Sequence, residues 1–128
     1  MTNNEARILL NGYAERIDQY SQKTKEFKFP VIAISAGALY SLGLKRDGTV
    51  VACGDNEGGE CEVSTWRDII AISAGESHSL GLKRDGTVVA CGDHKDGQCN
   101  VSGWRDIIAV SAGGVFSLGL KKDGTVVA

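Results

Sequence analysis

Four cysteines and two histidines are the side chains in this sequence with the chemistry to hold a metal ion or to act in nucleophilic catalysis. The cysteines form two pairs, Cys53 with Cys61 and Cys91 with Cys99, and seven residues separate the members of each pair. Because structural zinc sites usually place paired cysteines about two to four residues apart, this spacing argues against a metal. We expect packed structural thiols. A disulfide within each pair is a geometric alternative, which the reducing cytosol disfavours.

The two histidines occupy unrelated positions. His78 precedes the segment "SLGLK", as Tyr40 precedes an identical segment and Phe116 precedes a third copy, so the position calls for a ring. His94 stands in a polar segment. No serine, histidine and acid recur together as a catalytic set, and no glycine-rich segment carries the Gly-Lys-Ser/Thr signature of a phosphate site. We therefore expect no catalytic residue, no cofactor and no enzymatic activity.

A strict repeat of 38 residues sets the positions of these side chains, as the spacing of Cys53 from Cys91 and of Trp66 from Trp104 shows. The fifteen residues from Ser41 to Asp55, "SLGLKRDGTVVACGD", return unchanged from Ser79 to Asp93. The predicted units are repeat 1 (31–68), repeat 2 (69–106) and a partial repeat 3 (107–128).

Each repeat predicts four short β-strands. In repeat 2 they are "DIIAISAG", "SLGLK", "TVVACG" and the weaker "CNVSGW". The Asp-Gly between the second and third strands predicts a two-residue hairpin turn in which both central residues have positive φ. Because the first three strands are apolar on both faces, each sheet must be covered by its neighbours. The expected fold is all-β: a partial β-propeller of about three four-stranded blades. A linear β-solenoid is the alternative, and it lacks a hairpin in every turn.

The first thirty residues differ from the repeats. Apolar residues at helical spacing predict an amphipathic α-helix over residues 1–22; they are Leu9, Tyr13, Ile17 and Tyr20. Residues 23–30, "KTKEFKFP", lie one period before the fourth strand of repeat 1 and are predicted as a closing strand, which repeat 3 lacks. Two consequences stay open: a strand-exchanged dimer that forms a six-bladed ring, and a fragment of a longer propeller.

The segment "DIIAISAGESHSLGLKRDGTVVACGDHKDGQC" resembles the repeat of the regulator of chromosome condensation family. The resemblance covers residues 31–128 and implies a β-propeller that serves protein recognition. Members of this family include an exchange factor for a small GTPase and a secreted β-lactamase inhibitor. The chain departs from the family in having Cys53 and Cys91 where tryptophan is common, and in having fewer than three of the usual seven blades.

Bulk properties restrict the partners. The formal net charge is −2 and the pI is about 5.6, which argues against nucleic acid and membrane surfaces. No apolar run is long enough to span a bilayer, and the first residues lack a secretion signal. We expect a cytoplasmic protein.

The repeats differ from one another mainly in residues 38–40, 76–78 and 114–116, and in residues 56–60 and 94–98. In an up-and-down sheet both sets of loops emerge at the same end, which predicts a face that binds another protein, although drift at exposed loops produces the same pattern. The predicted binding residues are Leu39, Tyr40, Glu57, Glu60, Glu76, His78, His94, Lys95, Asp96 and Phe116. The alternative functions are a self-assembling or truncated structural unit, with a second copy of the chain as partner, and an exchange-factor-like regulator of a small GTPase.

Overall fold

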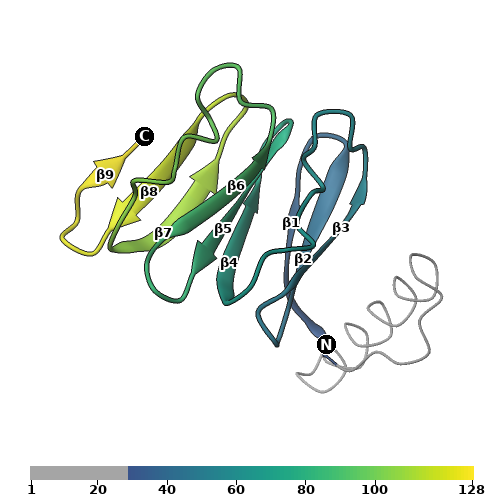
Figure 1. Ribbon diagram of the computed structural model, residues 1–128, viewed down its shortest axis with the longest axis horizontal. Helices are drawn as coiled ribbons and strands as arrows, with labels where there is room; N and C mark the ends of the chain where they lie inside the picture. The colour runs from purple at the N-terminus through teal and green to yellow at the C-terminus, as the bar shows by residue number, and fades with distance from the viewer. Residues whose placement is uncertain (1–28) are drawn as a thin grey trace, which may run out of the picture.

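The computed structural model describes residues 29–128, which form three small sheets (Figure 1). The strands of this part of the chain are β1 (Val31–Ala36), β2 (Tyr40–Lys45), β3 (Val50–Gly54), β4 (Ile69–Ala74), β5 (His78–Lys83), β6 (Val88–Gly92), β7 (Ile107–Ala112), β8 (Ser117–Lys121) and β9 (Val126–Val127). The helix predicted over residues 1–22 lies outside the described residues, as does the strand predicted over 23–30 except for its last two positions.

Each repeat folds into its own antiparallel sheet, with strand orders β1-β2-β3, β4-β5-β6 and β7-β8-β9. We call these sheets, with the segment that follows each, blade 1, blade 2 and blade 3; they stand side by side in chain order (Figure 1). The all-β prediction is confirmed for the described residues, and the three sheets begin at Val31, Ile69 and Ile107.

The prediction of a fourth strand in each blade is wrong for the described residues, since every sheet has three strands. The segment Cys61–Trp66 bonds to itself in turns: Val63 N donates to Cys61 O (2.9 Å), and Trp66 N donates to Val63 O (3.0 Å). The corresponding residues of blade 2 make the same bonds. Backbone groups used in local turns are not free to pair with a neighbouring strand, so the segment packs on the sheet without extending it.

The hairpins also differ from the prediction. Gly48 has a φ of 85°, but Asp47 is not among the residues with positive φ. Gly48 N donates to Lys45 O (3.0 Å) and Lys45 N donates to Thr49 O (2.9 Å), as in a longer turn that ends in a left-handed glycine. Asp47 Oδ1 accepts a bond from Thr49 Oγ1 (2.6 Å), which holds the turn. The same bond recurs in the hairpins of blades 2 and 3.

Two apolar clusters fill the spaces between neighbouring blades. The first contains Tyr40, Leu42, Leu44, Val50, Val63, Trp66 and Ile69, with Ile72, Ala74, Val89 and Cys91 packed against it. The second contains Leu80, Leu82, Val88, Val101 and Ile107, with Val110, Ala112 and Val127 packed against it. Each cluster joins one blade to the next, so the stability of the fold lies between the sheets rather than within them.

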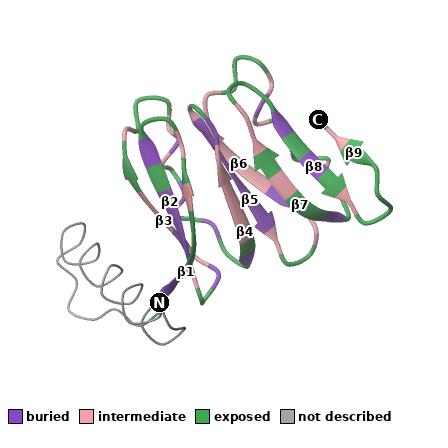
Figure 2. Ribbon diagram, turned by 180° about the vertical axis from the view of Figure 1, so that it is seen from behind, coloured by how far each residue is buried: buried purple, intermediate pink, exposed green. Residues whose placement is uncertain are grey.

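Every blade therefore has two faces. Its forward face, which in blade 1 includes Leu42, Leu44 and Val50, packs on the following blade. Its backward face, which in blade 2 includes Ile72 and Val89, packs on the preceding blade. In Figure 2 the central strand of blade 2, β5, is continuously buried along most of its length, whereas buried and exposed residues alternate along β8 of blade 3.

Candidate protein-binding face and the seams between blades

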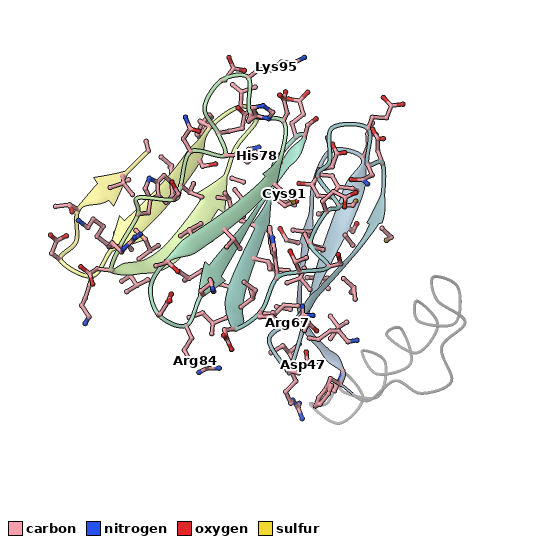
Figure 3. All side chains as sticks on the ribbon, in the orientation of Figure 1. Asp47, Arg67, His78, Arg84, Cys91 and Lys95 are labelled. Atoms are coloured by element: carbon pink, nitrogen blue, oxygen red, sulfur yellow. The ribbon has the colours of Figure 1, made fainter. Side chains whose placement is uncertain are left out.

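The two sets of variable loops meet at one end of the blades. Asp55 N donates to Leu39 O (2.9 Å), and the equivalent Asp93 N donates to Ser77 O (2.8 Å), so each turn after the first strand touches the loop after the third. Lys95 marks this end in Figure 3, and Asp47 and Arg84 mark the opposite end, where the hairpins lie. We call the exposed side chains at the first end the loop face.

Seven of the ten predicted binding residues are exposed on the loop face: Leu39, Glu57, Glu76, His94, Lys95, Asp96 and Phe116. Leu39 is 72% exposed and Phe116 is 55% exposed, so large apolar side chains stand in solvent among charged ones. The other three, Tyr40, Glu60 and His78, are buried. The binding role of all ten stays a prediction, and the three buried residues lie in the seams between blades.

Tyr40 connects blade 1 to blade 2. Its hydroxyl group donates a hydrogen bond to His78 O and lies 3.0 Å from Ser79 Oγ. Ser79 Oγ also lies 2.7 Å from Glu60 O, at the end of the loop of blade 1. Burial raises the pKa of Tyr40, against the opposing effect of the hydrogen bond with Ser79, so the neutral phenol is the favoured form.

His78 makes the equivalent connection from blade 2 to blade 3. Its Nε2 lies 2.9 Å from Ser117 Oγ, which donates to Gln98 O (2.7 Å). Because the single hydroxyl proton of Ser117 is used on Gln98, Nε2 of the neutral imidazole must carry the proton that His78 donates. Its Nδ1 is buried and has no hydrogen-bond partner among the described residues, so a second proton would find no acceptor. Burial lowers the pKa of His78, against the opposing effects of the Phe116 backbone and the Asp93 charge.

This geometry predicts that the protein loses stability in mild acid. The unfolded histidine takes up a proton as the pH falls below its ordinary pKa of 6.5, but the folded one resists it. The contribution to stability is thus complete above that pH and is lost as the pH falls towards the lowered pKa of the folded state. We expect the free energy of unfolding, measured by urea titration between pH 7 and pH 5, to fall by at most about 1.4 kcal/mol per pH unit.

His78→Tyr should remove most of this dependence, because Tyr40 fills the equivalent position with a group that does not titrate in this range. His94→Tyr is the matched control, since His94 is exposed on the loop face, and it should keep the dependence. An unchanged pH profile in His78→Tyr would contradict the assignment.

The cysteines are free thiols. Cys61 Sγ donates to Asp55 O (3.2 Å) and Cys99 Sγ donates to Asp93 O (3.3 Å), which closes the loop of each blade. Burial, with the nearby Cys99, raises the pKa of Cys91 to about 12, so its thiolate is disfavoured. Within residues 29–128, no three side chains of histidine, cysteine, aspartate or glutamate gather as a metal site. In the same residues, no helix has the length and apolar character needed to cross a membrane.

Two serines with a role in the seams escaped the sequence reasoning, namely Ser79 and Ser117, which are both buried. Ser117 accepts a hydrogen bond from His78 and donates one to Gln98 O, and Ser79 lies within hydrogen-bond distance of both the Tyr40 hydroxyl group and Glu60 O. The sequence did contain a signal for these serines, because the serine is the same in every repeat whereas the ring before it changes.

Antiparallel sheets that stack face to face through one recurring seam define a β-propeller repeat protein. The sequence model for the Regulator of chromosome condensation (RCC1) repeat matches residues 31–60 and 69–98. The chain therefore carries two repeats of the regulator of chromosome condensation type, which form part of a set of propeller blades.

Solved structures of propellers resemble the chain. Human WBSCR16 superposes with a TM-score of 0.66 at 24% identity, over 77% of this chain and 33% of that protein. Yeast RCC1 (Prp20), bound to Kap60, superposes with a TM-score of 0.66 at 22% identity, over 80% of this chain and 30% of that protein. The ectodomain of the Physcomitrella patens receptor kinase CR4 gives 0.65 at 26% identity, over 77% and 28%. The chain thus spans about a third of the length of these structures. No curated protein matches it.

Proposed function

We propose that the chain is a non-enzymatic, cytoplasmic module that binds another protein through its loop face. The observation that carries this proposal is the contrast between the two ends of the blades. The framework between them is nearly identical in each repeat, whereas the exposed side chains of the loop face change from repeat to repeat. A surface that varies on a constant scaffold is suited to specific recognition.

The chemistry of the loop face fits a protein partner. Leu39, Val115 and Phe116 are each more than half exposed and supply apolar contact area. The loops of blades 1 and 2 add exposed charged side chains at the same end; they are Glu57, Glu76, Lys95 and Asp96. Apolar anchors within a polar rim are typical of protein–protein interfaces. In support, the solved structure of yeast RCC1 is a complex with Kap60, and a study of Prp20p concerns its binding to Gsp1p and histones.

Site-specific crosslinking tests this proposal. A photoreactive side chain at Leu39 should crosslink a discrete protein in cells, whereas the same group at Arg46 should not, because Arg46 is exposed and directly precedes Asp47, which Figure 3 shows at the opposite end. Leu39→Asp should weaken binding of the captured protein about tenfold or more, and Arg46→Asp should leave it unchanged. Equal crosslinking at both positions, or full affinity in Leu39→Asp, would overturn the loop face as the binding surface.

A second candidate function is self-assembly, and one observation favours it: the outermost faces of the stack are apolar and exposed. Ile34 of blade 1 is 69% exposed, and Val126 of blade 3 is 59% exposed. The exchange of a strand from residues 23–30 stays a prediction, because only its last two positions are described. An exchange-factor-like activity has no comparable support from the described residues and is not part of the proposal.

A further inference from the structure

The two outer faces of the stack expose the side chains that form the core elsewhere. On the backward face of blade 1, Ile34 is 69% exposed, although its equivalent in blade 2, Ile72, packs into the first cluster. On the forward face of blade 3, Leu118 and Leu120 are 37% and 38% exposed, although the equivalent Leu80 and Leu82 are at most 1% exposed. Both faces therefore leave apolar area in water that the same residues bury inside the stack.

These two faces are the two halves of one interface, which the structure already contains twice. From its second and third strands the forward half supplies two leucines and a valine, which in blade 3 are Leu118, Leu120 and Val126; in the internal seams the segment after the third strand adds a valine and a tryptophan, Val63 with Trp66 and Val101 with Trp104. The backward half of blade 2 consists of Ile72, Ala74, Val89 and Cys91, and blade 1 has identical residues one period earlier: Ile34, Ala36, Val51 and Cys53. A cavity of about 340 Å³ opens along blade 1, and Ile34 and Cys53 are among its lining residues.

The hydrogen bonds across the seam also recur, and the groups that would form them are present at the open faces. Ala74 N donates to Ser35 Oγ (3.0 Å), and one period later Ala112 N donates to Ser73 Oγ (2.9 Å). At the open faces, the corresponding acceptor is Ser111 Oγ of blade 3.

A second backbone bond also recurs at each seam. Ile69 N donates to Gly48 O, and Ile107 N donates to Gly86 O, both at 3.0 Å. By the same register, the open faces offer Gly124 O on blade 3 and the amides of Val31 and Ala36 on blade 1. Donor and acceptor for two seam bonds are thus both present within one chain.

We propose that a second copy of the chain packs its blade 1 on blade 3 of the first, head to tail, in the register of the internal seams. The inference rests on the proposed self-assembly and commits it to one geometry. The contact is heterologous, because one copy contributes the backward face of blade 1 and the other contributes the forward face of blade 3. Pairing two backward faces, or two forward faces, would not bring the recurring donors opposite their acceptors.

One seam bond is missing from this joint. Phe116 stands where Tyr40 and His78 reach a serine of the next blade, and a phenyl ring has no polar atom. Its partner in the second copy is Ser41, which is exposed on the backward face of blade 1. The joint between copies is therefore weaker than the internal seams, because it lacks both the polar ring atom and the valine and tryptophan that follow the third strand in blades 1 and 2.

Complementation between two variants tests the geometry. Ile34→Lys blocks the backward face and Leu118→Lys blocks the forward face, so each variant alone should sediment as a monomer at concentrations where the unmodified chain associates. Their equimolar mixture should form a dimer, because one intact face of each kind remains. Ile70→Lys is the matched control: Ile70 is 45% exposed on blade 2, which has no open face, and this variant should associate like the unmodified chain.

The outcomes separate the inference from self-assembly itself. If the unmodified chain is a monomer from low micromolar concentration upward, both self-assembly and head-to-tail packing are overturned. If Ile34→Lys then lowers the stability of that monomer, the chain itself covers the backward face of blade 1. If the chain associates but the mixture of variants does not, head-to-tail packing alone is overturned. Urea unfolding checks that each variant folds, and Val126→Lys replaces Leu118→Lys if that variant does not, since Val126 is 59% exposed.

A second arm of the experiment strengthens the joint. Phe116→Tyr adds a hydroxyl group at the position of Tyr40 and should tighten association about two- to tenfold, as expected for one added hydrogen bond. In combination with Ser41→Ala the gain should shrink, because the hydroxyl group loses the partner that the register assigns to it. An equal gain with and without Ser41 would contradict the register.

Discussion

Leu80→Ala should lower the free energy of unfolding by about 2–5 kcal/mol, whereas Leu118→Ala should lower it by only about 1 kcal/mol. The two leucines occupy the same position of the same strand in successive repeats. Leu80 is 0% exposed between blades 2 and 3, and Leu118 is 37% exposed on the open forward face of blade 3. Truncation at Leu80 leaves a cavity in the seam, but truncation at Leu118 leaves water where water already reaches.

Urea unfolding followed by circular dichroism at low protein concentration measures both values. The comparison is sharp because strand position, residue type and neighbouring sequence are held constant. Repeating it at high concentration tests the joint between copies, because a second copy on blade 3 would bury Leu118 and raise the cost of its truncation. Equal costs at low concentration would show that single sheets, rather than the seams, hold the stability of the fold.

The sequence predicts the period, the all-β class and the stacking because those depend on side chains that recur. Ile69, Leu80 and Leu82 repeat in every unit or nearly so, and a sheet that is apolar on both sides has one stable arrangement, between two neighbours. The structure bears this out in the two clusters. The repeat does not reveal the backbone conformation of segments with a weaker strand pattern, because local and long-range hydrogen bonds compete there.

The fourth strand and the hairpin illustrate this limit. Cys61–Trp66 carries strand-forming residues, but turn bonds after Gly59 take up its backbone groups. Asp47-Gly48 signals a turn, but the sequence does not say that Gly48 alone takes the left-handed conformation. In both cases two sets of backbone hydrogen bonds compete. The free energies of the two conformations differ by only a few hydrogen bonds of about 1 kcal/mol each.

The candidate site was predictable in part. Residues of a strand that share a face are two apart, and Tyr40 is two residues before Leu42, which indicates that its ring points into the seam. The same argument applies to His78 and Leu80. Grouping these rings with the loops therefore overlooked the strand period. Phe116 holds the same position two residues before Leu118 and is exposed because no blade covers the forward face of blade 3. The other exposed members lie in loops, where no period constrains them, and their binding role rests on the proposed function.

Trp66 and Gly81 should show strong energetic coupling across the first seam. A Cβ atom at Gly81 would lie 2.8 Å from Cε3 and Cζ3 of the Trp66 indole and 3.1 Å from Ile69 Cδ1. The indole thus packs directly on the glycine, and Trp66 is only 6% exposed. Trp66→Ala should cost about 3–5 kcal/mol, and Gly81→Ala should cost about 1–3 kcal/mol, because the indole must shift.

The double variant should cost less than the sum of the two single variants by about 1 kcal/mol or more, since the methyl group then enters the space that the indole leaves. Gly43→Ala is the matched control: Gly43 is the equivalent position in blade 1, and its three nearest atoms all belong to Val31 and Val51. Its cost should simply add to that of Trp66→Ala. If the costs of Trp66→Ala and Gly81→Ala were additive as well, the indole would not rest on the glycine, and the constant glycine of the second strand would need another explanation than close approach between blades.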